Sequence, residues 1–113
     1  MDCIFCKIAA GTIPGDILYQ DEEIIALRDI QPQAPSHILI IPREHITSLD
    51  KITEAKSPLL SRMVNLANQL AIEEGIVKKG YRVAINCGPQ GGQTVPHLHL
   101  HLLGGRQLSG QLG

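Results

Sequence analysis

The longest regular pattern in the chain is a run of apolar residues at helical spacing. The apolar positions that recur every three or four residues are Leu59, Met63, Leu66, Ala67 and Leu70. These positions fall on one face of a helix with about 3.6 residues per turn. Ser57 is suited to be the N-cap, Pro58 to take the first helical position, and Gly75 to end the helix. The pattern therefore predicts one long amphipathic helix between Ser57 and Gly75.

Shorter apolar runs, bounded by turn residues, predict strands. The runs cover residues 17–20, 23–28, 37–41, 81–86 and 97–103. The turn-like pair Asp21-Glu22 between the first two runs indicates a hairpin, and Pro42 stops the third run. Residues 3–9 suit one or two helical turns, which Gly11 ends. Strands in pairs beside one long helix predict an α+β fold with a mainly antiparallel sheet.

Composition and charge are those of an ordinary globular domain. The 113 residues suit a single domain, 1–113, in which 43% of residues are hydrophobic and 19% are charged. Lys and Arg number 10 against 11 Asp and Glu, so the chain lacks the basic surplus of a nucleic-acid binder. Two Tyr, one Phe and no Trp are too few for a base-stacking platform. We therefore expect no nucleic-acid partner.

Neither a secretory signal nor a membrane anchor is expected. The start Met1-Asp2-Cys3 lacks the basic and apolar regions of a signal peptide. The most apolar run, 38–41, is too short to span a bilayer. Three cysteines, an odd number, cannot complete a disulfide framework within one chain. A reduced, cytoplasmic protein without a membrane partner is the expectation.

The candidate chemistry concentrates between Pro96 and Leu103. On a strand, alternation places His97, His99 and His101 on one face and the intervening leucines on the other. The outer two histidines would lie about 13 Å apart along a strand. Metal–nitrogen bonds are about 2.0–2.1 Å long, so those two histidines cannot share one ion. Since no Asp or Glu follows His101, a cupin-like iron site is disfavoured.

The alternative chemistry is nucleophilic catalysis at phosphorus. A neutral imidazole can attack phosphorus through one nitrogen if a hydrogen bond holds the other. His99, with an imidazole neighbour on either side, is the candidate nucleophile. The glycine-rich loop 87–94 directly precedes the histidines, and its backbone N–H groups can bind a phosphate. Taken alone, that loop is equally well a flexible turn.

These motifs resemble those of a known family. The run His97-Leu98-His99-Leu100-His101-Leu102-Leu103 resembles the His-φ-His-φ-His-φ-φ signature of the histidine triad (HIT) superfamily. Other stretches resemble its Hint branch in the same order: IFCKI (4–8), IP (13–14), DIQPQAPSH (29–37), IPREHI (41–46), GGQT (91–94) and LGGRQ (103–107). The resemblance implies a single HIT domain with a five-stranded, mainly antiparallel sheet, one long helix and one or two short helices. It also implies a homodimer in which two such sheets join into one of ten strands.

The resemblance further implies the activity of a purine nucleoside phosphoramidase. Such enzymes cleave the P–N bond of adenosine 5′-phosphoramidates and related nucleotides through a nucleotidyl-histidine, releasing AMP or GMP and an amine. No cofactor is required for that catalysis. The implied catalytic residues are His99 as nucleophile, His101 at the α-phosphate, His97 and His37 as orienting and charge-relaying residues, and Thr94 near the leaving group.

Nucleotide-binding residues are implied in the same way. Asp29 would accept both ribose hydroxyls, a role that suits the two oxygens of a carboxylate. The other implied contacts are Ile30, Asn86, Gly92, Gln93, Thr94, His99 and His101, with Phe5, Ile13, Leu27 and Leu39 lining a purine pocket. Plain structural roles stay open as alternatives: a turn residue for Asp29, a strand cap for Asn86, and core packing for His37 and the apolar residues.

Cys3 and Cys6 form a Cys-x-x-Cys pair, whose spacing presents two thiolates to one metal ion. A tetrahedral structural site needs two further ligands. The resemblance implies His45 and His97, because two histidines complete a zinc site in some bacterial-type members. A structural zinc and a pair of reduced buried thiols are the two alternatives. Cys87 has no evident partner.

Two other functions compete with the phosphoramidase. One is a dinucleoside polyphosphate hydrolase of the Fhit type, against which the LGGRQ stretch argues. The other is a nucleotide-binding scaffold or regulatory protein with incidental activity. The chain also departs from the usual pattern: Thr94 stands where Ser is common, Leu27 where an aromatic is frequent, and the tail lacks the Trp-Pro-Pro ending of animal members. That tail shapes the preference for the leaving amine.

Overall fold

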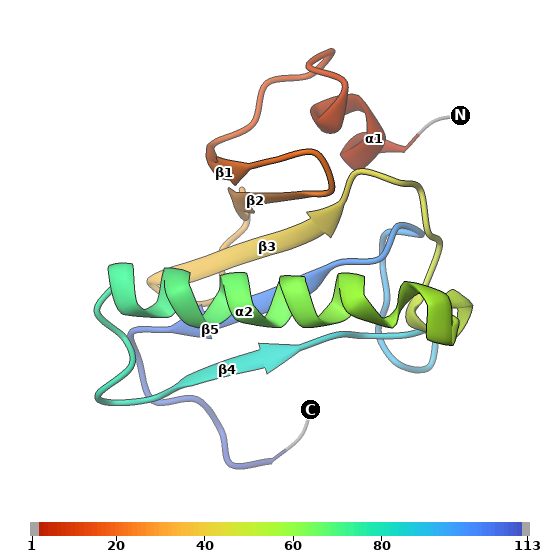
Figure 1. Cartoon of the computed structure of the whole chain (residues 1–113). Helices are drawn as coiled ribbons and strands as arrows, with labels where there is room; N and C mark the ends of the chain where they lie inside the picture. Colours follow the sequence, from red (N-terminus) through yellow and green to blue (C-terminus); the bar gives the residue numbers. More distant parts are fainter. Residues whose placement is uncertain (1–2, 112–113) are drawn as a thin grey trace.

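The five predicted strands form one sheet in which every neighbouring pair is antiparallel. The computed structural model describes residues 3–111. The strands are β1 (Ile17–Gln20), β2 (Ile24–Arg28), β3 (Ser36–Pro42), β4 (Tyr81–Ala84) and β5 (Leu100–Gly104), in the order β1-β2-β3-β5-β4 (Figure 1). The helices are α1 (Ile4–Ala9) and α2 (Ser57–Glu73), with short 3-10 helices at Leu49–Lys51 and Glu54–Lys56. The predicted α+β class is confirmed.

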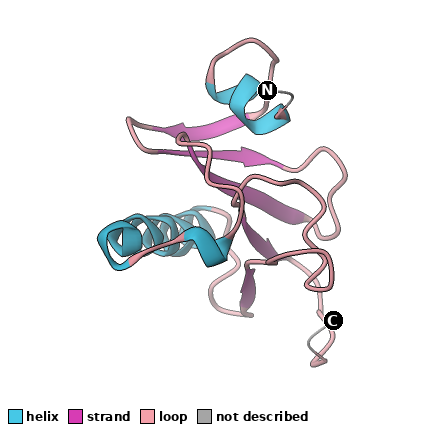
Figure 2. Cartoon of the chain, turned by 90° about the vertical axis from the view of Figure 1, so that its right-hand side faces the viewer, coloured by secondary structure: helices cyan, strands magenta, loops and turns pink. Residues whose placement is uncertain are grey.

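Each face of the sheet packs against a different helix. α2 lies along one face (Figures 1 and 2), where its apolar stripe meets Ile38 and Ile40 of β3. Leu39 and Ile41 point to the opposite face and join Phe5 of α1 in a second apolar cluster. Because successive side chains alternate between the two faces, β3 is buried along its whole length. This central strand and β5 beside it carry the candidate site.

The predicted long helix is present, but its first residue differs from the prediction. Ser57 is not the N-cap, because a 3-10 helix runs directly into α2 and Ser57 already has helical dihedrals (φ −59°, ψ −31°). Its hydroxyl donates to the main-chain oxygen of Glu54 at 2.7 Å. Gly75 follows the helix with φ +72°, a conformation that glycine adopts without strain. Within residues 3–111, no helix is long and apolar enough to cross a membrane.

The strand predicted for residues 97–103 begins only at Leu100. Extending the β3–β5 register (Ile40 opposite Leu100) would place Leu98 opposite Pro42, which has no N–H to donate. The Pro42 oxygen is already engaged by His97 Nε2 at 2.8 Å. Leu98 and Leu100 nevertheless face the α2 side, as the alternation predicts. The segment before Leu100 is therefore held outside the strand ladder, by the Leu98 N–H, which donates to the Ile46 oxygen at 2.6 Å, and by the side-chain contacts of the histidines.

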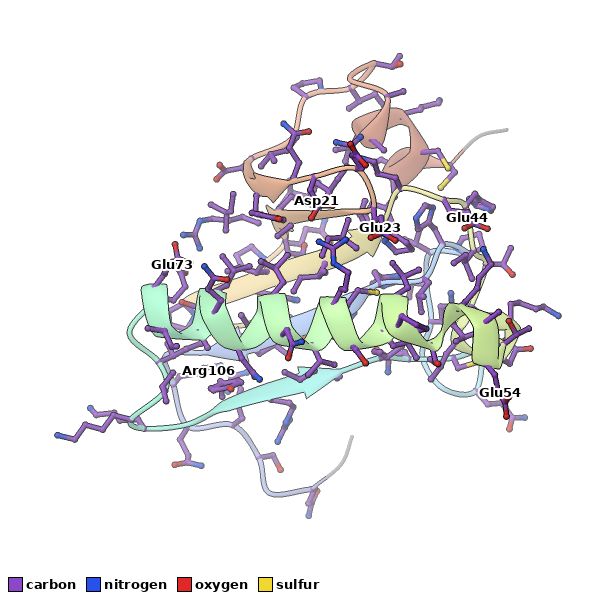
Figure 3. The ribbon with its side chains drawn as sticks, in the orientation of Figure 1. Asp21, Glu23, Glu44, Glu54, Glu73 and Arg106 are labelled. Atoms are coloured by element: carbon purple, nitrogen blue, oxygen red, sulfur yellow. The ribbon has the colours of Figure 1, made fainter. Side chains whose placement is uncertain are left out.

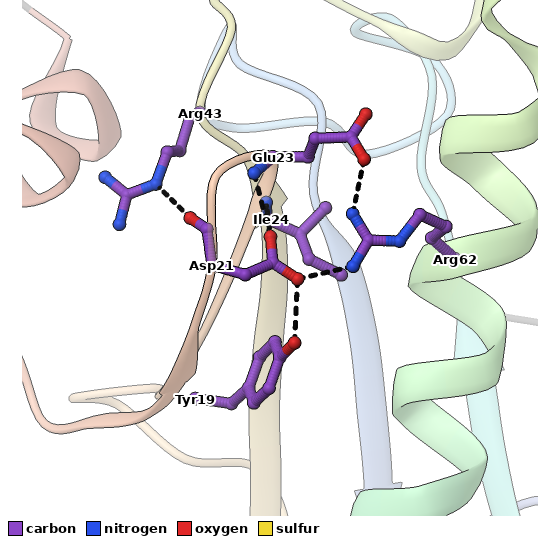
Figure 4. A network of polar contacts seen from close by, with 6 residues as sticks. All are labelled: Tyr19, Asp21, Glu23, Ile24, Arg43 and Arg62. Atoms are coloured by element: carbon purple, nitrogen blue, oxygen red, sulfur yellow. Dashed lines mark hydrogen bonds and ion pairs between the residues drawn. The ribbon is translucent and has the colours of Figure 1, made fainter.

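A polar network joins α2 to the turn between β1 and β2 (Figure 4). Asp21 Oδ1 accepts hydrogen bonds from the main-chain N–H groups of Glu23 (2.8 Å) and Ile24 (2.9 Å). Asp21 Oδ2 accepts from the Tyr19 hydroxyl at 2.7 Å and pairs with Arg62 of α2. Arg62 also donates to Glu23 Oε1 at 2.5 Å. One carboxylate thus caps the turn and ties the hairpin to the helix.

Candidate active site

His99 holds one ring nitrogen in a hydrogen bond to a main-chain oxygen, so the neutral ring has its lone pair on the other nitrogen. Its Nδ1 lies 2.7 Å from the main-chain oxygen of His97. Since a carbonyl oxygen only accepts hydrogen bonds, Nδ1 carries the proton, and Nε2 of the neutral ring keeps its lone pair. Phe5 packs edge-on against the ring, with 5.3 Å between centroids, and His99 is 6% exposed. A nucleophilic imidazole requires this protonation pattern.

His37 and His101 pair beside His99, and one main-chain amide sets the protonation of both. The N–H of Gln33 donates to His37 Nδ1 at 3.0 Å, so the proton of neutral His37 lies on Nε2. His37 Nε2 lies 2.9 Å from His101 Nδ1 and donates to it. The proton of neutral His101 is therefore on Nε2. His99 and His101, with ring centroids 4.9 Å apart, carry opposite protonation at Nε2.

Burial keeps these imidazoles neutral at neutral pH. It is the largest effect on His37, where it lowers the pKa below the ordinary value for histidine, while Asp29 acts in the opposite direction. Burial, with the neighbouring His99 and His37, lowers the pKa of His101 to about 4. The tautomers of His37 and His101 are therefore those present at physiological pH.

His97 turns away from His101 into a cluster of sulfur and nitrogen atoms. Its Nδ1 lies 3.2 Å from Cys3 Sγ, 3.6 Å from Cys6 Sγ and 3.2 Å from His45 Nδ1. Cys6 Sγ lies 3.2 Å from the same nitrogen of His45. The predicted single row of three imidazoles is thus divided. His97 joins the cysteines, His101 joins His37, and His99 lies between the two clusters.

The Cys3–Cys6–His45–His97 cluster fits a tetrahedral metal ion. Its four donor atoms all lie within 4.8 Å of one another. Zinc with bonds of about 2.0–2.3 Å separates its tetrahedral ligands by about 3.3–3.8 Å, close to the contacts given above. His97 Nε2 donates its proton to the Pro42 carbonyl, so His97 Nδ1 is unprotonated, as a metal ligand must be.

A second cluster of metal-ligating types, Asp29, His37 and His101, does not fit a metal in this way. Its donor atoms also lie within 4.8 Å of one another. However, the Gln33 N–H occupies His37 Nδ1 and leaves the proton on His37 Nε2, the atom that faces the cluster. A protonated nitrogen has no lone pair for a metal. This group is a hydrogen-bond chain.

The glycine-rich loop is held in shape by two of the predicted site residues. Asn86 lies beyond the end of β4, which is shorter than predicted, and its amide donates to the Gly91 oxygen at 2.7 Å. Gln93 accepts from the Gly88 N–H at 2.9 Å and donates to the Thr47 oxygen at 2.7 Å. Two other members, Gly92 (φ +82°) and Thr94, are exposed. The loop therefore stands open to solvent directly before the histidines.

Asp29 lies at the start of the loop between β2 and β3 and next to His37. One carboxylate oxygen accepts the Gln31 N–H at 2.8 Å, so the turn role is present, and the other lies 3.4 Å from His37 Nε2. Ile30 is 88% exposed and contributes to no core. The residues expected at the purine pocket, Phe5, Leu27 and Leu39 with Ile13 packed against them, belong to the apolar cluster beneath α1.

Three main-chain groups that determine the site could not be found from the sequence. The oxygens of His97 and Pro42 and the N–H of Gln33 set the protonation of the four buried or half-buried imidazoles. Every residue except proline carries the same two groups, so no residue type marks them. Only Pro32 and Pro35, which shape the loop around Gln33, are visible as a signal.

The antiparallel sheet and the His-x-His-x-His run entering β5 define a histidine triad protein. The family model described as "Scavenger mRNA decapping enzyme C-term binding" matches residues 2–112. The chain is 47% identical over 111 residues to the purine nucleoside phosphoramidase of Escherichia coli K12, covering 98% of this chain and 93% of that protein. It is 46% identical over 110 residues to a 14 kDa zinc-binding protein of Brassica juncea, covering 96% of each.

Solved structures agree with the sequence comparisons. A HIT family hydrolase from Legionella pneumophila matches with a TM-score of 0.96 at 47% identity, covering 99% of this chain and 100% of that chain. The chain belongs to the histidine triad (HIT) family and is a HIT-family hydrolase. The predicted family resemblance is confirmed.

Proposed function

We propose that the protein hydrolyses the P–N bond of purine nucleoside 5′-phosphoramidates. The observation that carries this proposal is the opposite protonation of His99 and His101, which places an unprotonated nucleophile beside a proton-bearing ring. Attack on a phosphoryl group needs both a nucleophile and a donor to the phosphoryl oxygens. The identity to the Escherichia coli purine nucleoside phosphoramidase supports P–N cleavage over the Fhit-type reaction.

The reaction has two balanced steps. His99 Nε2 attacks phosphorus, a P–N bond to the ring forms, and the bond to the leaving nitrogen breaks as that nitrogen takes up a proton and departs as an amine. Water then attacks the nucleotidyl-histidine, releases AMP or GMP with loss of a proton, and returns His99 to its neutral form. The His101 N–H donates to a phosphoryl oxygen in both steps, while the His97 carbonyl holds the ring of His99.

The remaining residues of the proposal bind the nucleotide. The loop residues Gly92, Gln93 and Thr94, with Asn86 bracing the loop, would surround the phosphate and leaving group. Asp29, with Ile30 beside it, would bind the ribose hydroxyls. The apolar cluster around Phe5 would receive the purine from the side of the sheet that α1 covers.

Phosphorus NMR of adenosine 5′-phosphoramidate tests this function. We compare the wild type with His99→Asn, which keeps a donor for the His97 carbonyl but has no nucleophilic nitrogen, and with Gln69→Ala on the exposed face of α2 as a control. We expect AMP from the wild type and the control only. Turnover by His99→Asn would contradict the nucleophile. Faster cleavage of diadenosine triphosphate would favour the Fhit-type reaction, and AMP binding without turnover of either substrate would favour a scaffold.

We also propose that Cys3, Cys6, His45 and His97 hold a structural zinc ion. When bound, zinc would tether the N-terminal segment to the chain after β3, and it supplies no step of the reaction. The zinc-binding relative from Brassica juncea supports this choice of metal. Metal analysis after dialysis should give about one zinc per chain. Cys6→Ser should lose the metal and Cys87→Ser, at the exposed third cysteine, should keep it; equal zinc in both variants would contradict the site.

The family resemblance implies a dimer with one ten-stranded sheet, and we infer that the second copy pairs along β4. Among the described strands, β4 pairs only with β5 and has a free edge, and its Val83 is 38% exposed. An open cavity of about 870 Å³ lies where β4 begins. None of the histidines lines it, so it is separate from the candidate active site. Sedimentation should give about twice the mass of 12.3 kDa. Val83→Lys should give monomers and Leu18→Lys, on the opposite edge strand, should not; a monomeric wild type would refute the pairing.

A further inference from the structure

We infer that Arg106 is a positioning residue for the active-site histidines, a role that rests on the proposed function. Arg106 is exposed and lies beyond the end of β5 (Figure 3). Its Nε donates to the main-chain oxygen of Gln33 at 2.9 Å. The N–H of Gln33 donates to His37 Nδ1 at 3.0 Å, and His37 Nε2 lies 2.9 Å from His101 Nδ1. Three hydrogen bonds in series thus connect Arg106 to His101.

The chain matters because its first bond holds Gln33 in position and its last two bonds determine where the protons of His37 and His101 lie. The two neutral forms of an imidazole differ little in intrinsic stability, so a hydrogen-bond partner decides between them. Without the Gln33 N–H at Nδ1, only the Asp29 carboxylate oxygen, 3.4 Å from Nε2, would favour the proton on Nε2, and His37 could carry its proton on either nitrogen. His101 would then spend part of the time with its proton on Nδ1. In that state it would face a phosphoryl oxygen with a lone pair and repel it.

The loop that carries Gln33 is held both by its own hydrogen bonds and by the chain after β5. It joins β2 to β3, and its base is closed by the Asp29 N–H, which donates to the His37 oxygen at 3.0 Å. At its other side the chain after β5 comes close: a Cβ added to Gly105 (φ +94°) would lie 2.9 Å from Pro35 Cβ. Arg106 follows Gly105 directly, and its Nε donates to the main-chain oxygen of Gln33. The LGGRQ stretch (103–107) therefore holds this loop in position.

Histidine NMR tests this role without depending on turnover. Long-range ¹H–¹⁵N spectra assign the tautomers of His37 and His101 in the wild type, Arg106→Ala and Arg106→Lys. The matched control is Arg82→Ala, because Arg82 also donates to a main-chain oxygen of the C-terminal segment, that of Ser109, and within the described residues it makes no hydrogen bond to Gln33. The same four proteins are assayed for kcat and KM with adenosine 5′-phosphoramidate.

In the wild type and in Arg82→Ala we expect one tautomer of His37, with its proton on Nε2. In Arg106→Ala we expect a mixture, with kcat/KM about 3- to 10-fold lower, the worth of one hydrogen bond. Arg106→Lys, which retains one donor, should lie between the two. A single unchanged tautomer in Arg106→Ala would overturn the inference whatever the activity. A wild type with the expected tautomers but no turnover would refute the proposed function and leave the positioning chain intact.

Discussion

The low pKa of His101 predicts how the stability of the protein depends on pH. Its pKa is lowered to about 4 in the folded protein by burial and by the neighbouring His99 and His37, against about 6.5 for an unperturbed histidine. Because the folded value is the lower one, the unfolded chain binds the proton first as pH falls. The contribution of His101 is therefore fully present above pH 6.5 and is lost progressively as the pH falls towards 4.

When the pH falls from 7.5 to 5.0, His101 should lower the free energy of unfolding by about 2 kcal/mol. The reason is that over this interval the unfolded chain takes up a proton at this residue and the folded protein largely does not. Urea unfolding at both pH values measures the change in the free energy of unfolding. His101→Gln removes the titrating group and keeps a polar side chain opposite His37. We expect its stability to fall by about 2 kcal/mol less than that of the wild type over the same interval. An equal pH dependence in the two proteins would refute the reasoning.

Three further predictions concern stability and activity. Asp21→Ala removes the acceptor of two main-chain N–H groups and of Arg62, so urea unfolding should show a loss of about 2–3 kcal/mol, with Asp21→Asn between that and the wild type. Since these bonds lower the pKa of Asp21, its contribution is present at neutral pH and should fade in acid. Leu102→Ala, at a fully buried position of β5, should cost about 2–5 kcal/mol of unfolding free energy, whereas Val77→Ala, at an exposed position after α2, should cost under about 1 kcal/mol; comparable losses would contradict the packing. Thr94→Val replaces the hydroxyl of an exposed loop residue by a methyl group and should lower kcat for the phosphoramidate without changing the melting temperature. Thr94→Ser keeps the hydroxyl and should keep the kcat of the wild type.

Local patterns determined most of the secondary structure. The apolar stripe of α2 and the alternation before β5 were readable because burial repeats with the period of a helix or a strand. The exact starts of elements were less readable. The prediction of Ser57 as N-cap was wrong because a 3-10 helix precedes α2. The predicted strand start at His97 was wrong because Pro42 lies where the strand would need a donor.

The side chains of the site were visible in the sequence, whereas their partners were not. Alternation alone separated three histidines from three leucines, since the leucines have to reach the core beneath α2. Which cluster each histidine joins was decided by the fold, because His37 comes from β3 and Cys3 from the segment before α1. The protonation of each ring was decided by main-chain groups such as the N–H of Gln33. Those groups are the same in nearly every residue, so only the tertiary structure, which brings one of them within 3.0 Å of a ring nitrogen, could assign the nucleophile and the proton donor.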